Sequence, residues 1–201
     1  MGWLPFLLGA LACALAQQSS TEGLRHTHVD QNPHVAGTEA EPVPVFVGPA
    51  LDVVVSAESA VAWDMATGHI LYEKQADERC PVASISKLLT VLTAREHLEL
   101  GEYVVVPDEA ALIGRRGANI KLAPGSLANV EELMAASLVA SANDAALSLA
   151  VASAGSEPVF SDQAYAFART HGIFDTRLSN ATGFSGGEQF STAHNVRRLL
   201  L

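Results

Sequence analysis

The chain has 201 residues, which is enough for one domain with a buried core and an extension. Apolar residues make up 49% and charged residues 17% of it, a composition typical of a globular protein. The formal net charge is −10 and no run of basic residues occurs. This balance argues against a nucleic-acid partner, because neutralising phosphates requires clustered Lys and Arg.

Residues 1–16 are predicted to form a signal peptide. The apolar run from Trp3 to Ala16 is too short to span a bilayer comfortably, and it ends in small residues that suit a signal peptidase before polar Gln17. No Lys or Arg precedes the run. A lipoprotein signal with Cys13 as the lipidated residue is the alternative interpretation. Either way, we expect export to the periplasm or another extracytoplasmic cell-wall space.

Residues 17–45 are polar and contain prolines without an apolar period, so we predict a disordered linker. Three histidines occur in it: His26, His28 and His34. We interpret them as solvated rather than metal-binding, because the segment offers no Cys and no ordered carboxylate. The folded domain is predicted to cover residues 46–201.

The folded domain is predicted to begin with a β-hairpin. Residues 60–64 and 69–73 are rich in β-formers, and Gly68 between them can take the positive φ of a turn. Residues 84–98 then show a helical period that is apolar over much of the circumference, so this helix is predicted to be central and largely buried. Gly101 ends it.

The rest of the chain is predicted to be mainly helical. Asn129 is a good N-cap for the next helix, and Asp144 can cap the helix after it. The predicted helices cover residues 129–140, 144–154, 159–170 and 192–201.

Ser84 and Lys87 form a Ser-x-x-Lys motif at the start of the first helix. The spacing of three puts both side chains on one helix face, and a helix N-terminus stabilises negative charge that develops on Ser84. A serine needs a base, and a lysine acts as one only if its ammonium form is disfavoured, for example by burial. An isolated motif of this kind is more often a surface Ser and Lys.

A second motif, Ser141-Ala-Asn143, interrupts the helical pattern further along the chain. Ser141 could shuttle a proton between base, nucleophile and leaving amine, and Asn143 could bind a substrate amide through its paired donor and acceptor. The plainer interpretation is that these residues only end one helix and begin the next. Cys80 is interpreted as a bystander thiol rather than a nucleophile, since no Cys-His-Asn grouping accompanies it.

From about Ala60 to Leu199 the chain resembles the D-alanyl-D-alanine carboxypeptidases, the low-molecular-mass penicillin-binding proteins of serine peptidase family S11. The resemblance rests on these stretches: Trp63-Asp64, Gly68, Tyr72-Glu-Lys74, Pro81-Val-Ala-Ser84-Ile-Ser-Lys87, Gly125, Ser141-Ala-Asn143-Asp144, Asp175-Thr176, Asn180-Ala-Thr-Gly183 and Phe190-Ser191-Thr192-Ala193. It implies an α+β fold like that of the penicillin-binding proteins and serine β-lactamases, an antiparallel sheet with a helical subdomain.

The resemblance also implies a reaction. Ser84 would be the acylated serine, Lys87 the proton acceptor, and Ser141 with Asn143 the second element of the site. The enzyme would remove the terminal D-Ala of peptidoglycan stem peptides ending in D-Ala-D-Ala, and β-lactams would acylate Ser84 as inhibitors. No cofactor, metal or nucleic acid is implied, and no membrane anchor is expected within the 201 residues.

Two departures from the family pattern stand out. Ala142 replaces a Gly, which is harmless unless the backbone there needs positive φ. The Lys-Thr-Gly that binds the substrate carboxylate in the family is missing, since no lysine follows Lys121. We therefore expect that only the N-terminal hairpin of the sheet is present, that the C-terminal strands are missing, and that the chain is a truncated form.

Two other functions remain open. A serine β-lactamase would share both motifs, and Glu157-Pro158 resembles part of its deacylating Glu-Pro-x-x-Asn, but Ser161 stands where Asn belongs. A non-catalytic wall-binding relative would explain the missing Lys-Thr-Gly. The retention of both Ser84 and Lys87 is evidence against that second alternative.

Overall fold

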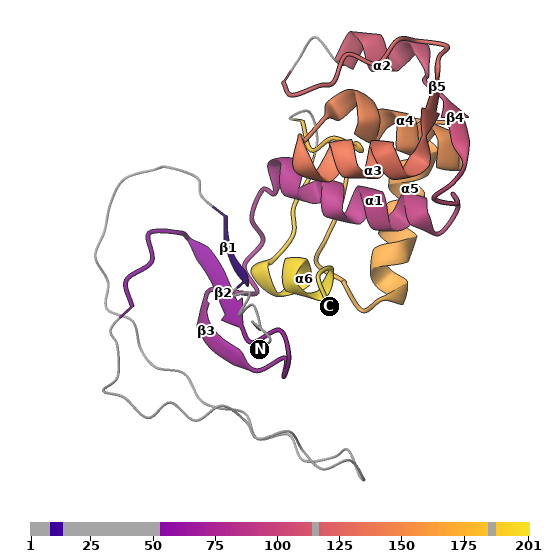
Figure 1. Cartoon of the computed structure of the whole chain (residues 1–201). Helices are drawn as coiled ribbons and strands as arrows, with labels where there is room; N and C mark the ends of the chain where they lie inside the picture. The colour runs from indigo at the N-terminus through magenta and orange to yellow at the C-terminus, as the bar shows by residue number, and fades with distance from the viewer. Residues whose placement is uncertain (1–8, 14–52, 114–116, 185–187) are drawn as a thin grey trace, which may run out of the picture.

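The computed structural model describes residues 9–13, 53–113, 117–184 and 188–201. They form a helical part and a smaller antiparallel sheet, with α6 (Ala193–Arg198) close to the place where the two meet (Figure 1). The predicted linker, residues 17–45, lies outside the described residues.

The predicted hairpin is confirmed as β2 (Ser59–Trp63) and β3 (Ile70–Lys74), which pair antiparallel. In the turn, a carboxylate oxygen of Asp64 accepts two backbone N–H groups. Gly68 completes the turn with φ 72°, a value that glycine adopts without strain. The hairpin is therefore specified locally, by one Asp and one Gly.

A third strand, β1 (Gly9–Cys13), pairs antiparallel with the other edge of β2, so the sheet order is β1-β2-β3. The expectation that only a hairpin is present was wrong for this reason: a free strand edge carries unpaired N–H and C=O groups that another extended segment can satisfy. These five residues belong to the predicted signal peptide, residues 1–16, and that assignment stays a prediction.

A second small sheet was also not predicted. It consists of β4 (Tyr103–Val105) and β5 (Leu127–Asn129), paired antiparallel, with the short helix α2 (Asp108–Ile113) between them in the chain. Three-residue strands are too short to show an alternating pattern in the sequence.

The predicted helices are all found, with small shifts of their ends. The helical part contains the 3-10 turn η1 (Ala83–Ser86), α1 (Lys87–Arg95), α3 (Val130–Val139), α4 (Asn143–Ala154) and α5 (Glu157–Thr170). Asn129 caps α3 as predicted, accepting two backbone amides of its first turn through Oδ1. The helix predicted to start at residue 84 begins with η1 instead.

Helix α4 lies at the centre of the helical part and packs against α1, α2, α3 and α5. Every residue from 143 to 150 is buried. Ala145, Ala146 and Ala150 are small enough for neighbouring helices to approach closely, and Leu149 fills the space between them. Helix α1 is largely buried too, as predicted, but α4 is buried around its whole circumference over two turns.

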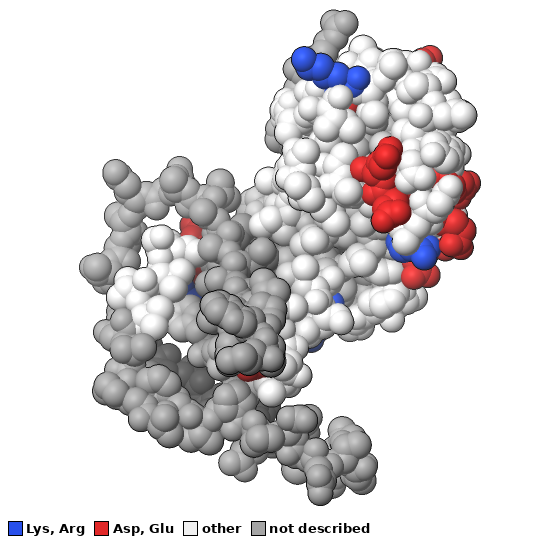
Figure 2. Space-filling view, viewed as in Figure 1, with Lys and Arg blue, Asp and Glu red and all other residues white. Residues whose placement is uncertain are grey.

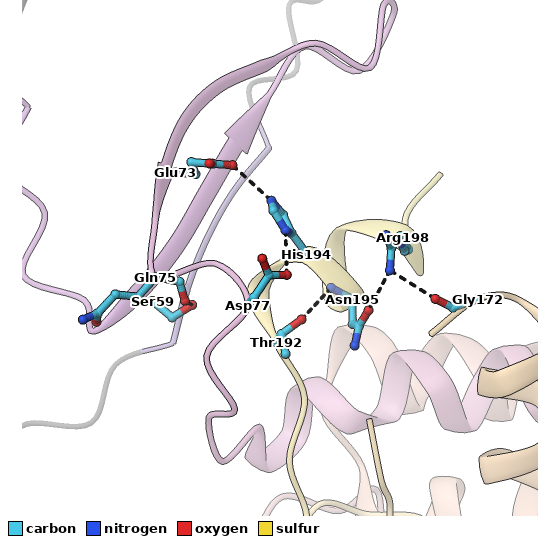
Figure 3. A network of polar contacts seen from close by, with 9 residues as sticks. All are labelled: Ser59, Glu73, Gln75, Asp77, Gly172, Thr192, His194, Asn195 and Arg198. Carbon is cyan, nitrogen blue, oxygen red and sulfur yellow. Dashed lines mark hydrogen bonds and ion pairs between the residues drawn. The ribbon is translucent and has the colours of Figure 1, made fainter. Parts of the chain in front are cut away.

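Helix α6 links the sheet to the helical part through polar contacts (Figure 3). His194 contacts the carboxylates of Glu73 and Asp77 at 3.2 and 3.0 Å. At the other end of α6, Arg198 donates to the carbonyl of Gly172, just past α5, at 3.1 Å. Thr192 caps α6 by accepting the backbone amide of its third residue.

The charged groups are distributed unevenly over the helical part. Figure 2 shows Asp and Glu side chains gathered on the side where β4 lies, with few Lys or Arg on the same face. Among the described residues, no helix is both long and apolar enough to cross a membrane.

Candidate active site

Ser84 lies in η1, immediately before α1, and its side chain is exposed to solvent. The residue before it, Ala83, has φ 41°, in the left-handed region that residues with a Cβ rarely adopt. This strained turn presents Ser84 at the surface while Lys87, one turn later, points into the protein. Strain of this kind is common at functional sites.

Lys87 is almost fully buried, with 1% of its surface exposed. Its Nζ atom lies 3.1 Å from Ser84 Oγ, 3.4 Å from Ser141 Oγ and 2.6 Å from the carbonyl oxygen of Thr182. Burial lowers the pKa of this amine to about 8, because the ammonium form loses its hydration. The predicted nucleophile, base and proton shuttle are therefore brought together in space.

Ser141 lies between α3 and α4 with φ 54°, so the chain turns sharply at this residue. Ala142 has φ −65° and is fully buried. The positive φ thus falls on Ser141 and not on Ala142, which means that Ala is tolerated at this position as expected. The sharp turn also brings the Ser141 hydroxyl within reach of Lys87.

Asn143, the predicted substrate-binding residue, is the first residue of α4 and is buried. Its backbone amide donates to the carbonyl of Ala118 at 2.9 Å. Its side-chain amide lies against Gly117, where a Cβ would come within 2.9 Å of Nδ2. Gly117 has φ 77°, so this close approach depends on glycine.

Asp144 has a different role from the predicted helix cap. The N-cap of α4 is Ala142, and Asp144 is the second residue of the helix. Its carboxylate accepts the backbone amides of Ile120 and Leu122 at 2.9 to 3.2 Å. The buried carboxylate therefore holds the segment after Gly117 against the start of α4, beside Asn143.

Sequence reasoning did not identify the part played by residues 180–184. The carbonyl of Thr182 makes the shortest contact of Lys87, and that of Ala181 accepts the Thr90 hydroxyl at 2.8 Å. In the sequence, Asn180-Ala-Thr-Gly183 indicates only a loop that supports the family resemblance. A backbone carbonyl has no residue-type signature, so the only available signal was the Asn-x-x-Gly turn pattern.

Glu157 and Cys80, the two residues of the rival interpretations, are both held by structural contacts. Glu157 begins α5, and its Oε1 accepts the backbone amide of Ala181 at 2.9 Å. Cys80 is buried, and its backbone forms an isolated antiparallel bridge with Ser191.

The sheet and the helical part together form a penicillin-binding protein and serine β-lactamase-like α+β fold. A D-alanyl-D-alanine carboxypeptidase DacD from Francisella tularensis superposes with a TM-score of 0.71 and 28% identity, over 84% of this chain and 42% of that one. A peptidoglycan synthesis regulatory factor (PBP3) from Streptococcus pneumoniae gives a TM-score of 0.66 and 32% identity, over 74% and 47%. The predicted fold class is thereby confirmed.

The sequence profile of the D-alanyl-D-alanine carboxypeptidase family matches residues 47–201. The D-alanyl-D-alanine carboxypeptidase DacF of Bacillus subtilis (strain 168) is 33% identical over 145 residues, which cover 70% of this chain and 37% of the relative. The chain belongs to the D-alanyl-D-alanine carboxypeptidase family, as the motifs predicted. It spans roughly two fifths to a half of the length of the curated relatives that it matches.

Proposed function

We propose that the protein carrying this chain is a serine D-alanyl-D-alanine carboxypeptidase that acts on peptidoglycan outside the cytoplasmic membrane. The observation that carries the proposal is the buried Nζ of Lys87, which lies within hydrogen-bond reach of both Ser84 Oγ and Ser141 Oγ. A pKa lowered to about 8 leaves a useful fraction of this amine neutral near neutral pH.

In the proposed reaction, neutral Lys87 takes the proton of the Ser84 hydroxyl as Oγ attacks the carbonyl carbon between the two D-Ala residues. The Ser84–acyl bond forms, the C–N bond breaks, and the terminal D-Ala leaves as an amine that receives a proton through Ser141. Water then hydrolyses the acyl-enzyme and releases the shortened stem peptide. The N-terminal end of α1 stabilises negative charge that develops at the attacked carbonyl.

Asn143 completes the proposed site as the group that binds the substrate amide. Its contact with Gly117 and its place on the first turn of α4 support a fixed orientation for the side-chain amide. A β-lactam would acylate Ser84 in the same way but would leave no separate amine, because its ring nitrogen stays attached to the acyl group. This difference makes penicillin a convenient probe of the first step.

The test is mass spectrometry of the intact protein after incubation with benzylpenicillin. We expect one penicilloyl adduct on Ser84, absent from Ser84→Ala and kept in Ser161→Ala, a matched control on α5. A peptide ending in D-Ala-D-Ala should then release free D-Ala, whereas cleavage inside the peptide would indicate an endopeptidase. An adduct that survives Ser84→Ala would overturn the assignment of the nucleophile.

A folded protein that forms no adduct but is retained on isolated peptidoglycan would instead support the non-catalytic wall-binding alternative. Rapid turnover of penicillin, with no adduct that accumulates, would favour the β-lactamase alternative.

A further inference from the structure

Residues 180–184, named here the 180–184 turn, form a closed set of hydrogen bonds organised by Asn180. Its Oδ1 accepts the amides of Thr182 and Gly183 at 3.1 and 2.9 Å, and the Thr182 hydroxyl at 3.0 Å. Its Nδ2 donates to the carbonyl of Phe184 at 2.8 Å. One side chain therefore holds both ends of the turn.

The 180–184 turn is also fixed from outside. Glu157 accepts the amide of Ala181, and Thr90 donates to its carbonyl. Gly183 has φ 74°, and a Cβ at this position would lie 1.9 Å from the carbonyl oxygen of Ala83. The turn is thus pressed against the strained backbone that presents Ser84, with no room for a side chain between them.

The partners of Lys87 Nζ determine how its N–H groups and its lone pair are used. A neutral amine has two N–H groups and one lone pair, and the Thr182 carbonyl can only accept. At 2.6 Å this carbonyl takes one N–H, which leaves one N–H and the lone pair for the two serine hydroxyls. Ser84, at 3.1 Å, is the nearer of the two, and Ser141 is at 3.4 Å.

We propose that the 180–184 turn orients the lone pair of Lys87 Nζ toward Ser84 Oγ, and that Asn180 is the main positioning residue of this turn. The inference rests on the proposed function. Before the reaction, Lys87 donates to Thr182 and Ser141 and accepts the Ser84 proton. Once that proton has moved, the ammonium group has three N–H groups and three acceptors in place, so no reorganisation is needed.

The experiment compares two substitutions at Asn180 by the rate of Ser84 acylation with a fluorescent penicillin between pH 6 and pH 10. Asn180→Ala releases the turn, so we expect a ~10- to 100-fold lower rate at every pH. Asn180→Asp keeps an acceptor for the three donors, but it loses the donor to the Phe184 carbonyl and adds a negative charge. Its rate should fall near neutral pH, recover toward wild type at pH 10, and show a midpoint shifted to higher pH.

Asn129→Ala is the matched control, since Asn129 also accepts backbone amides through Oδ1, at the start of α3. We expect it to lower the melting temperature about as much as Asn180→Ala while leaving the acylation rate and its pH midpoint unchanged. If Asn129→Ala slows acylation as strongly as Asn180→Ala does, the positioning role of Asn180 is wrong. The same holds if both Asn180 variants acylate at the rate of wild type, and in either case the proposed function stands.

A second measurement does not depend on acylation. The chain has three lysines, so labelling lysine with ¹³C and ¹⁵N gives few side-chain signals, and Lys87 is assigned from its loss in Lys87→Met. The NMR titration of Lys87 should move to higher pH in Asn180→Asp and to lower pH in Asn180→Ala, which loses the carbonyl that favours the ammonium. An unchanged titration in folded variants would reject the inference even in a protein that penicillin does not acylate.

Discussion

The helical part of the chain buries a continuous set of apolar side chains around α4, whereas the described side chains of β2, β3 and their surroundings form a much smaller buried cluster. In the sheet part the buried cluster consists of Val61, Trp63, Ala76 and Ala193, with Ile70 packed against it. The sheet also reaches the helical part partly through polar contacts of α6, and the carboxylates among them are exposed (Figure 3).

This difference bears on the candidate site, because all its parts belong to the helical part. Ser84 and Lys87 come from η1 and α1, Ser141 from the junction of α3 and α4, and Thr182 from the 180–184 turn. The three atoms around Lys87 Nζ are therefore held by helix packing and by one turn. We infer that the packing around α4 stabilises the site more than the sheet does.

The largest effect is expected in that packing. Leu149→Ala removes a fully buried side chain from the centre of α4 and should lower the free energy of unfolding by about 2–5 kcal/mol, as large-to-small changes in well-packed cores do. Urea unfolding of the purified protein measures it. Leu138→Ala on α3, where the residue is 46% exposed, is the control and should cost less than about 1 kcal/mol.

Equal losses for the two leucine variants would mean that the helical part has no tightly packed centre. The contrast between the two parts of the molecule would then have to be abandoned.

The buried Lys87 makes the free energy of unfolding of the helical part depend on pH. Burial lowers the pKa of Lys87 from 10.5 to about 8. Between these pH values the unfolded chain still holds the proton that the folded chain has lost, so the free energy of unfolding rises with pH. The rise attributable to Lys87 is at most about 3 kcal/mol, and it is complete above the unfolded pKa.

Lys87→Met should therefore lose this part of the pH dependence, and it should not be acylated by penicillin. Urea unfolding of wild type and variant at several pH values from 7 to 11 gives the part of the pH dependence that Lys87 causes. The contributions of the other titrating groups are the same in both proteins and cancel in the comparison. Stability curves that run parallel over this range would show that Lys87 is not desolvated in the folded protein.

How much of this site could be predicted from the sequence depends on how local each contact is. Ser84 and Lys87 are one turn apart, so their spacing alone predicts that they meet, and Asn129 is identifiable as a cap from its own neighbourhood. The contact of Lys87 with Ser141 spans 54 residues, so spacing does not predict it; the Ser-x-Asn motif and the family resemblance suggested it.

The parts that could not be predicted are backbone features. The carbonyl of Thr182 lies 95 residues from Lys87 and is an acceptor that every residue type provides. The positive φ of Ser141 and Ala83 depends on how α3 and α4 are joined and on the contact with Gly183, which are consequences of packing. Similarly, β4 and β5 have three residues each, too few for an alternating pattern to identify them, and β1 lies within the apolar run that was interpreted as a signal peptide.

The smallest effect is expected where α6 contacts the hairpin. His194→Ala removes the contacts with Glu73 and Asp77, but these carboxylates are 46% and 88% exposed, so water replaces the lost partners. We expect the free energy of unfolding to fall by less than about 1 kcal/mol and Ser84 acylation to be unchanged. His69→Ala, at an exposed position next to the hairpin turn, is the matched control. Slower acylation in His194→Ala alone would mean that the sheet part holds the site in place through α6, which contradicts the division of roles inferred from the packing.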